Sequence, residues 1–242
     1  MKLILPQLTA ELSPAVSCDG SILIMAAGGR PPQTKWLQQT VTGTGTLWAI
    51  DRGIDVCHQT GLLPHRLIGD ADSADGDSWH WAEQQGVPID RYAPAKDLTD
   101  FQLALELSRR DFEQSFLIVT GAFGGRLDHA FSLLYSLVGD GRSGCLADEQ
   151  EVLLLLRGGE SAEITLRAEA ADSLSALSLL PLAPVCRGLS LSGVRWPLED
   201  TVLTQQLPYA VSNELLPQTK KISVSLADGV VGIYFVFGSL TA

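Results

Sequence analysis

The chain has 242 residues, of which 45% are hydrophobic and 19% charged, so it is long enough to bury a sizeable core as one large domain or two smaller ones. Its formal net charge of −11, without any long run of lysines or arginines, argues against nucleic acid or an anionic membrane as the main partner. The four cysteines stand far apart and the longest apolar runs are too short to span a bilayer, so we expect a cytoplasmic protein without a zinc site or a disulfide framework.

Short apolar runs alternate with helix-like stretches from about residue 21 to residue 140. We expect strands at 21–26, 46–50, 65–69, 87–92 and 115–120, with helices between them and after the last. Thr99 and Gln102 have the spacing of a capping box, which predicts a helix with Asp100 in its first turn. This alternation predicts a parallel sheet covered by helices.

From about residue 150 the pattern changes to strands without convincing helices. The segment "KISVSL" (221–226) alternates strictly between apolar and polar residues, and Asp228-Gly229 then precedes "VVGIYFVF". Alternation followed by a turn signal predicts a hairpin, and the whole half predicts an antiparallel sandwich or barrel. The first 20 residues show little periodicity and stay unassigned.

Aspartates and glycines follow four of the predicted strands. The segments are "DRG" at 51–53, "GDADS" at 69–73, "KDLTD" at 96–100 and "GAFGGRLDH" at 121–129. In an open parallel sheet, ligands bind beyond the carboxyl ends of the strands. We therefore expect these segments to meet at one rim.

Several carboxylates close together repel one another unless a cation lies between them. Aspartate oxygens without histidine or cysteine neighbours suit Mg²⁺ better than zinc, and glycine-rich backbone N–H groups can approach phosphate oxygens. Taken singly, "GDADS" also fits an ordinary turn, Asp100 a helix-dipole partner, and "AAGGRPP" (26–32) a plain turn rather than a dinucleotide loop. Their combination predicts a metal–nucleotide site.

These four segments, with "GVRWPL" (193–198), "SNEL" (212–215) and the terminal "ISVSLADGVVGIYF", resemble the thiamin pyrophosphokinase family in order and over most of the chain. The resemblance implies the fold class α/β: an N-terminal Rossmann-like parallel α/β domain that binds ATP and Mg²⁺ (1–145), followed by an antiparallel β-sandwich domain that binds thiamin (146–242). It also implies a homodimer with active sites near the subunit interface. The implied reaction converts ATP and thiamin to AMP and thiamin diphosphate.

The resemblance also implies roles for individual residues. The catalytic carboxylates would be Asp70, Asp72, Asp100 and Asp128, of which Asp70, Asp72 and Asp100 would bind the metal. ATP and its phosphates would contact Asp51, Arg52, Lys96, Asp97, Gly124, Gly125 and Arg126. Thiamin would contact Trp196, Ser212 and Asn213. Either Asp100 or Asp128 could accept the proton of the thiamin hydroxyl.

The sequence leaves two of these implied roles open. Without the resemblance, Trp196 fits equally well as a packing residue in the sandwich core. Many relatives have phenylalanine between the two aspartates of "GDADS", where this chain has Ala71, whose smaller side chain leaves less packing beneath the loop.

Two other classes of function fit part of the pattern. A phosphatase or nuclease could use the same acidic rim, with Asp70 as an aspartyl nucleophile, but it would have no use for Trp196. A thiamin- or nucleotide-binding sensor would bind tightly and form no AMP. The enzyme is favoured because every acidic position that the transfer requires is present.

Overall fold

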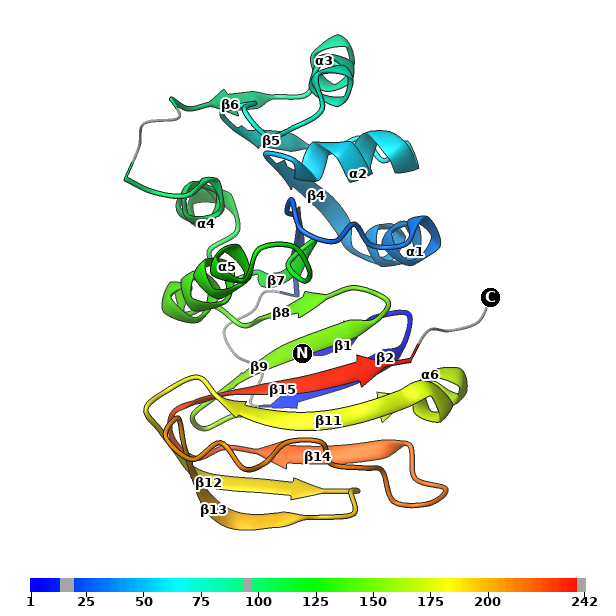
Figure 1. The fold of residues 1–242 in the computed structure, drawn as a ribbon, viewed down its shortest axis with the longest axis vertical. Coiled ribbons are helices and arrows are strands. Elements are labelled where there is room, and N and C mark those ends of the chain that lie inside the picture. Colours follow the sequence, from blue (N-terminus) through cyan, green and yellow to red (C-terminus); the bar gives the residue numbers. More distant parts are fainter. Residues whose placement is uncertain (14–19, 94–96, 239–242) are drawn as a thin grey trace. The chain divides into compact units, whose positions relative to one another are not determined.

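The structure is a computed structural model of the 242-residue chain and describes residues 1–13, 20–93 and 97–238. The chain divides into two compact units, which Figure 1 colours along the sequence. One unit is Asp19–Asp148, and the other combines Glu149–Ala242 with Met1–Cys18, of which residues 1–13 are described. The sequence analysis placed the N-terminal segment in the α/β domain, whereas in the structure this segment clusters with the β-rich unit.

The first unit, Asp19–Asp148, contains a parallel sheet with the strand order β8-β7-β3-β4-β5-β6. Its strands are β3 (Ile22–Ala26), β4 (Gly45–Ile50), β5 (Arg66–Gly69), β6 (Ile89–Arg91), β7 (Phe116–Thr120) and β8 (Gly144–Ala147). Its helices are α1 (Thr34–Thr44), α2 (Gly53–Thr60), α3 (Gly76–Gln84), α4 (Asp100–Asp111) and α5 (Leu127–Asp140). The predicted strands and helices are confirmed, and β8 is an additional strand that the sequence analysis did not predict. None of the helices in the described ranges is both long and apolar enough to cross a membrane.

The predicted capping box at the start of α4 is confirmed. Thr99 Oγ1 accepts a hydrogen bond from the Gln102 N–H at 3.3 Å, and Gln102 Oε1 accepts one from the Thr99 N–H at 2.9 Å. Phe101 and Leu105 on the apolar face of the helix are buried. The two reciprocal bonds satisfy N–H groups that a helix start leaves unpaired, so the position of Asp100 in the first turn is well defined.

Arg142, which follows α5, forms a buried ion pair at the end of that helix and hydrogen bonds to the C-terminal end of α4. Arg142 contacts Asp140 at 2.6 Å, and both side chains are almost fully buried. Its guanidinium also donates to the carbonyl of Phe112 at 2.9 Å, to that of Leu105 at 3.2 Å and to Ser108 Oγ at 2.8 Å. One side chain thus supplies hydrogen bonds to carbonyl and hydroxyl groups at the end of α4 that water cannot reach.

The second unit consists of antiparallel strands in two groups (Figure 1). One group has the order β1 (Lys2–Ile4), β2 (Leu8–Ser13), β10 (Ser161–Leu166), β14 (Lys221–Ser225), β12 (Val185–Ser192), β13 (Leu198–Thr204). The other has the order β11 (Leu174–Pro181), β15 (Val230–Phe237), β9 (Glu151–Arg157). A short helix, α6 (Ala168–Ser173), interrupts a half in which the sequence predicted none.

The predicted hairpin of residues 221–237 is wrong. β14 pairs with β10 and β12, whereas β15 pairs with β9 and β11, so the two strands belong to different groups. The turn at Asp228 is held instead against β12, because the N–H groups of Ala227 and Asp228 both donate to the carbonyl of Arg187, each at 3.1 Å. The alternation of β14 is confirmed, since Ile222 and Val224 are buried.

Candidate functional site

The carboxyl ends of the parallel strands carry most of the residues predicted from the sequence. Asp51 directly follows β4, Asp70 directly follows β5, and Asp100 is the first residue of α4. The glycine-rich segment Gly121–Gly125 follows β7. Because all of these strands are parallel, their carboxyl ends lie at one edge of the sheet.

Three of these carboxylates converge. One oxygen from each of Asp51, Asp70 and Asp100 lies within 4.8 Å of the others, and all three residues are half-buried. We call them the aspartate trio. No histidine or cysteine joins the trio among the described residues, so its donor set consists of carboxylate oxygen alone.

Asp51 is held in an unusual conformation within the trio. Its φ is 46°, and its N–H donates to the carbonyl of Ile68 at 2.7 Å. Ser73 Oγ donates to Oδ2, whereas the buried Oδ1 accepts no hydrogen bond from the described residues. Burial raises the pKa of Asp51, as do the charges of Asp100 and Asp70, against the opposing effect of the Ser73 hydrogen bond.

Asp72 lies beside the trio and is exposed. Ala71 has a φ of 67°, which turns the chain so that the Asp72 N–H donates to Asp70 Oδ1 at 3.2 Å. A side-chain hydrogen bond with Asp70 is the main cause of a raised pKa at Asp72, followed by desolvation and the charges of the trio. The trio therefore includes Asp51, which sequence reasoning placed among the ATP contacts, and Asp72 is its neighbour.

The arrangement fits a hard divalent cation. Three carboxylates at this distance repel one another in water, and a buried oxygen without a hydrogen bond, such as Asp51 Oδ1, is costly. A cation with an all-oxygen ligand preference would remove both penalties. Mg²⁺ has that preference and typically binds one or two carboxylates together with substrate phosphates.

The glycine-rich segment lies at the same edge of the sheet. Gly121 has a φ of 67°, and a Cβ atom there would lie 2.1 Å from the carbonyl oxygen of Ala27, so only glycine fits. Gly124 and Gly125 also have positive φ angles, of 71° and 69°. Gly124 and Gly125, which are exposed, can thus present backbone N–H groups to an anion just before α5 begins.

Arg126 and Asp128 form an exposed ion pair at the start of α5. Arg126 Nη2 lies 2.6 Å from Asp128 Oδ2, and Arg126 Nε lies 3.1 Å from Oδ1. The hydrogen bond from Arg126 lowers the pKa of Asp128 below its ordinary value. Asp128 is therefore ionised at neutral pH and stays outside the trio.

The other residues predicted to contact the nucleotide are exposed or lie outside the described residues. Asp97 is exposed in the segment before α4. Arg52 precedes α2, is largely exposed and lies 3.6 Å from Asp55. Lys96 lies outside the described residues. Sequence reasoning assigned no role to Ser73, although its position in "GDADS" beside the aspartates was a signal for a ligand-orienting hydroxyl.

Trp196, Ser212 and Asn213 come together in the second unit. Asn213 Oδ1 accepts from the Trp196 N–H at 3.1 Å, and Asn213 Nδ2 donates to the Trp196 carbonyl at 2.7 Å. Ser212 has a φ of 56°, and its N–H donates to Ser178 Oγ at 3.1 Å. The Asn213 amide therefore holds the backbone that carries Trp196.

The Trp196 side chain points to the surface, since the residue is 51% exposed. The alternative of a sandwich-core tryptophan is therefore wrong. Arg195 lies over the ring at 4.8 Å from its centroid and forms an ion pair with Glu214 at 2.8 Å. An exposed indole that already stacks with one cation has the geometry for cation–π binding.

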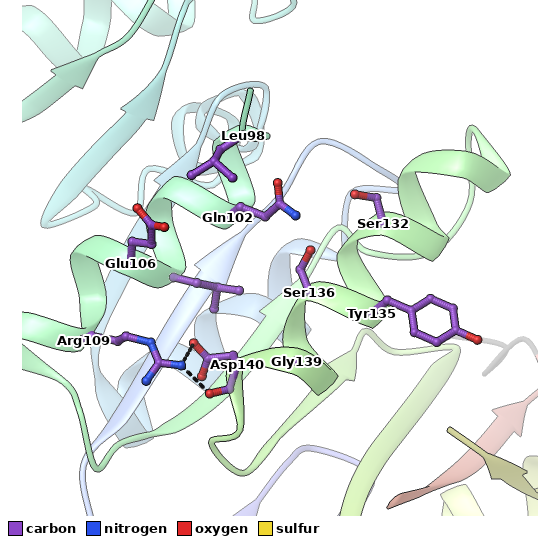
Figure 2. Close-up of a pocket in the computed structure, with 10 residues that line it drawn as sticks. Leu98, Gln102, Glu106, Arg109, Ser132, Tyr135, Ser136, Gly139 and Asp140 are labelled. Carbon is purple, nitrogen blue, oxygen red and sulfur yellow. Dashed lines mark hydrogen bonds and ion pairs between the residues drawn. The ribbon is translucent and has the colours of Figure 1, made fainter. Parts of the chain in front are cut away.

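A separate groove of about 560 Å³ lies between α4 and α5 (Figure 2). Gln102 and Tyr135 contribute to its lining, and Figure 2 shows Arg109 and Asp140 in contact along one side, at 3.1 Å. Its lining includes none of the site residues that the sequence predicted and the structure describes. The groove is therefore distinct from the aspartate trio.

Comparison with known proteins gives matches over both units. Residues 37–144 match the family model "Thiamin pyrophosphokinase, catalytic domain", and residues 163–231 match "Thiamin pyrophosphokinase, vitamin B1 binding domain". A curated relative, the thiamine pyrophosphokinase of Bacillus subtilis (strain 168), is 27% identical over 194 residues, which cover 78% of this chain and 87% of the relative.

Solved structures agree in fold. The crystal structure of thiamine pyrophosphokinase from Bacillus subtilis has a TM-score of 0.72 at 24% identity, covering 90% of this chain and 99% of that one. The enzyme from Geobacillus thermodenitrificans has a TM-score of 0.73 at 23% identity, covering 90% and 98%. The yeast enzyme has a TM-score of 0.70 at 14% identity, covering 90% and 87%.

The two family models together span the glycine-rich and aspartate-bearing strand ends of the first unit and the Trp196–Asn213 segment of the second. Sequence motifs, fold and family models thus agree across both halves of the chain. The chain belongs to the thiamin pyrophosphokinase family.

Proposed function

We propose that this chain transfers the diphosphate of ATP to the hydroxyl group of thiamin, giving thiamin diphosphate and AMP, at the edge of the sheet that carries the aspartate trio. The observation that carries the proposal is the approach of Asp51, Asp70 and Asp100 to within 4.8 Å of one another. Membership of the thiamin pyrophosphokinase family supports it. In this proposal the α/β unit binds ATP, and the β-rich unit supplies the thiamin contacts.

The trio would hold Mg²⁺, with Asp72 adjacent through its hydrogen bond to Asp70. When bound, the ion supplies positive charge that offsets the charge of the triphosphate. Transfers of this kind need little covalent help from the protein, so positioning and charge neutralisation carry most of the catalysis.

The remaining residues at the rim act on the phosphates and the hydroxyl proton. Gly124, Gly125 and Arg126 bind phosphate oxygens through backbone N–H groups and the guanidinium. Arg52 and Asp97 would contact ATP at the same edge of the sheet, and the predicted contact from Lys96 lies outside the described residues. We assign the hydroxyl proton to Asp128, because Asp100 belongs to the trio and Asp128 lies outside it.

Thiamin carries a positively charged thiazolium ring, which suits the exposed face of Trp196. Ser212 supplies a polar contact nearby, and Asn213 acts mainly by fixing the backbone of Trp196. We also propose that the chain forms the homodimer that the resemblance implies.

The proposal is tested by incubating the protein with thiamin and Mg-ATP and separating AMP, ADP and thiamin phosphates. We expect AMP and thiamin diphosphate in equal amounts. ADP with thiamin monophosphate would mean that one phosphoryl group moved. Inorganic phosphate released without thiamin would identify a phosphohydrolase, and tight binding without products would identify a sensor.

Replacing Asn213 with alanine is expected to raise the KM for thiamin about tenfold, since two hydrogen bonds to Trp196 worth roughly 0.5–1.5 kcal/mol each are lost. The KM for ATP should not change. Gln205→Ala, at an exposed position of the same unit, is the control and should alter neither constant. Steady-state kinetics with each substrate varied in turn measures both, and an unchanged KM for thiamin would contradict the role of Asn213.

A further inference from the structure

Arg30 bridges the ends of strands that are not neighbours in the sheet. It lies in the loop after β3, and Asp148 directly follows β8, while β7 lies between these two strands. Arg30 donates to Asp148 Oδ2 from Nη2 at 2.6 Å and from Nε at 3.0 Å. The ion pair therefore spans the carboxyl end of β7, where the segment Gly121–Gly125 begins.

The loop that carries Arg30 also contacts this glycine-rich segment directly. The Gly29 N–H donates to the carbonyl of Gly121 at 2.7 Å, and the Arg30 N–H donates to that of Phe123 at 2.6 Å. The Arg30 guanidinium lies over the Phe123 ring, at 5.9 Å from its centroid. A Cβ atom on Gly29 would lie 2.5 Å from the Gly121 oxygen, which shows how closely the two backbones approach.

Asp148 determines where the Arg30 side chain can lie. The Asp148 side chain is 0% exposed, whereas that of Arg30 is 29% exposed. A fully buried carboxylate is very unfavourable without a charged, hydrogen-bonded partner. The planar guanidinium makes two hydrogen bonds to one oxygen, which fixes its direction as well as its distance.

We propose that Arg30, held by the buried Asp148, is a positioning residue that fixes the glycine-rich segment Gly121–Gly125 for binding the phosphates of ATP. The inference rests on the proposed function for the role of that segment. Several backbone N–H groups bind one phosphate together only when all of them point toward it. A small displacement of the segment that carries them therefore weakens binding. The Arg30 side chain and the two backbone hydrogen bonds hold the segment in place without contacting the substrate.

The test uses four variants: Asp148→Asn, Arg30→Gln, Arg30→Lys and the double variant Arg30→Gln/Asp148→Asn. Asp148→Asn and Arg30→Gln should each raise the KM for Mg-ATP about tenfold and change the KM for thiamin less than about twofold. The double variant should be no worse than either single one, because both remove the same contact. Arg30→Lys keeps the charge and should show an intermediate effect.

Amide hydrogen exchange provides a readout that does not depend on activity. In Asp148→Asn, the peptide covering 121–126 should exchange faster than in the wild-type protein, while peptides from β4 and β5 should not change. If the wild-type protein forms no thiamin diphosphate, the proposed function fails, and the exchange measurement still tests the positioning of the segment.

The chain contains a control pair in which the arginine is matched in exposure but the aspartate is 27% exposed instead of fully buried. Arg66 and Asp90 form an ion pair between β5 and β6, with the Arg66 side chain also 29% exposed and its guanidinium 5.3 Å from the centroid of an aromatic ring, that of Trp48. Arg66→Gln and Asp90→Asn should leave the KM for Mg-ATP and the exchange of 121–126 unchanged.

Two results would overturn the proposal. If Arg30→Gln raises the KM for Mg-ATP while Asp148→Asn does not, Arg30 contacts the nucleotide itself. If both variants lower the midpoint of thermal unfolding but leave the KM and the exchange of 121–126 at wild-type values, the pair only stabilises the fold.

Discussion

Asp70→Asn is expected to lower kcat about a thousandfold, in the upper range for removing one preorganised electrostatic group from an active site. Asp70 supplies a trio oxygen and also hydrogen-bonds to Asp72, so it contributes to both parts of the acidic cluster. Its loss removes one ligand of the proposed cation. Turnover measured at saturating Mg-ATP and thiamin checks the expectation.

The same variant should be at least as stable as the wild-type protein in metal-free buffer. The charge of Asp70 helps to raise the pKa values of both Asp51 and Asp72, which is the signature of like-charge repulsion in the folded state. Removing one charge relieves that repulsion. Thermal unfolding with EDTA should therefore give an equal or higher midpoint, and the midpoint should rise less with added Mg²⁺ than in the wild-type protein.

Asp77→Asn is the control, because Asp77 is an exposed acidic residue in the first turn of α3, outside the trio. It should keep wild-type turnover and its response to Mg²⁺. Asp72→Asn should also lose most turnover, since it removes the carboxylate charge that lies beside the trio while keeping the backbone hydrogen bond to Asp70. Near-normal turnover in Asp70→Asn would show that the trio does not hold the metal of the reaction.

Arg142→Met is expected to lower the free energy of unfolding by about 3–5 kcal/mol, the usual effect of removing one partner from a buried ion pair. The Asp140 side chain is only 2% exposed and would keep a buried charge without its main partner. The carbonyls of Leu105 and Phe112 would lose donors as well. Urea denaturation followed by circular dichroism measures the change.

Arg109→Met is the matched comparison for Arg142. Arg109 contacts the same aspartate at 3.1 Å, but its side chain is 47% exposed, so its loss should cost about 1 kcal/mol or less. Adding Asp140→Asn to Arg142→Met should recover part of the lost stability, because the buried charge is then gone. Equal losses for the two arginine variants would show that burial does not govern the strength of this contact.

Local sequence patterns were sufficient for most elements of the α/β unit. Apolar runs predicted the strands β3, β4, β5 and β7, because segments that are buried on both faces of a parallel sheet contain few polar residues. The Thr99–Gln102 capping box predicted the start of α4 to the residue, since all of its hydrogen bonds lie within one helical turn. The gathering of the aspartates at one edge of the sheet was predicted from their positions after the strands, because the carboxyl ends of parallel strands lie at the same edge.

The pairing of strands in the β-rich unit required the tertiary structure. Asp228-Gly229 signals a reversal of the chain, but a turn does not specify which strands its two arms will pair with. β14 enters the group with β10 and β12, and β15 enters the group with β9 and β11. Likewise, β1 and β2 pair with each other and β2 with β10, a partner distant in the sequence.

By itself, the sequence determined the elements of the first unit, the edge of the sheet where the acidic residues gather and the family to which the chain belongs. Only the tertiary structure decided that Asp51 joins Asp70 and Asp100 in the trio, and that Arg30 reaches Asp148 across 118 positions of sequence. The physical reason is the range of the interactions. Periodicity and capping act over a few residues, whereas convergence of carboxylates and burial of an ion pair depend on how distant strands are ordered in the sheet.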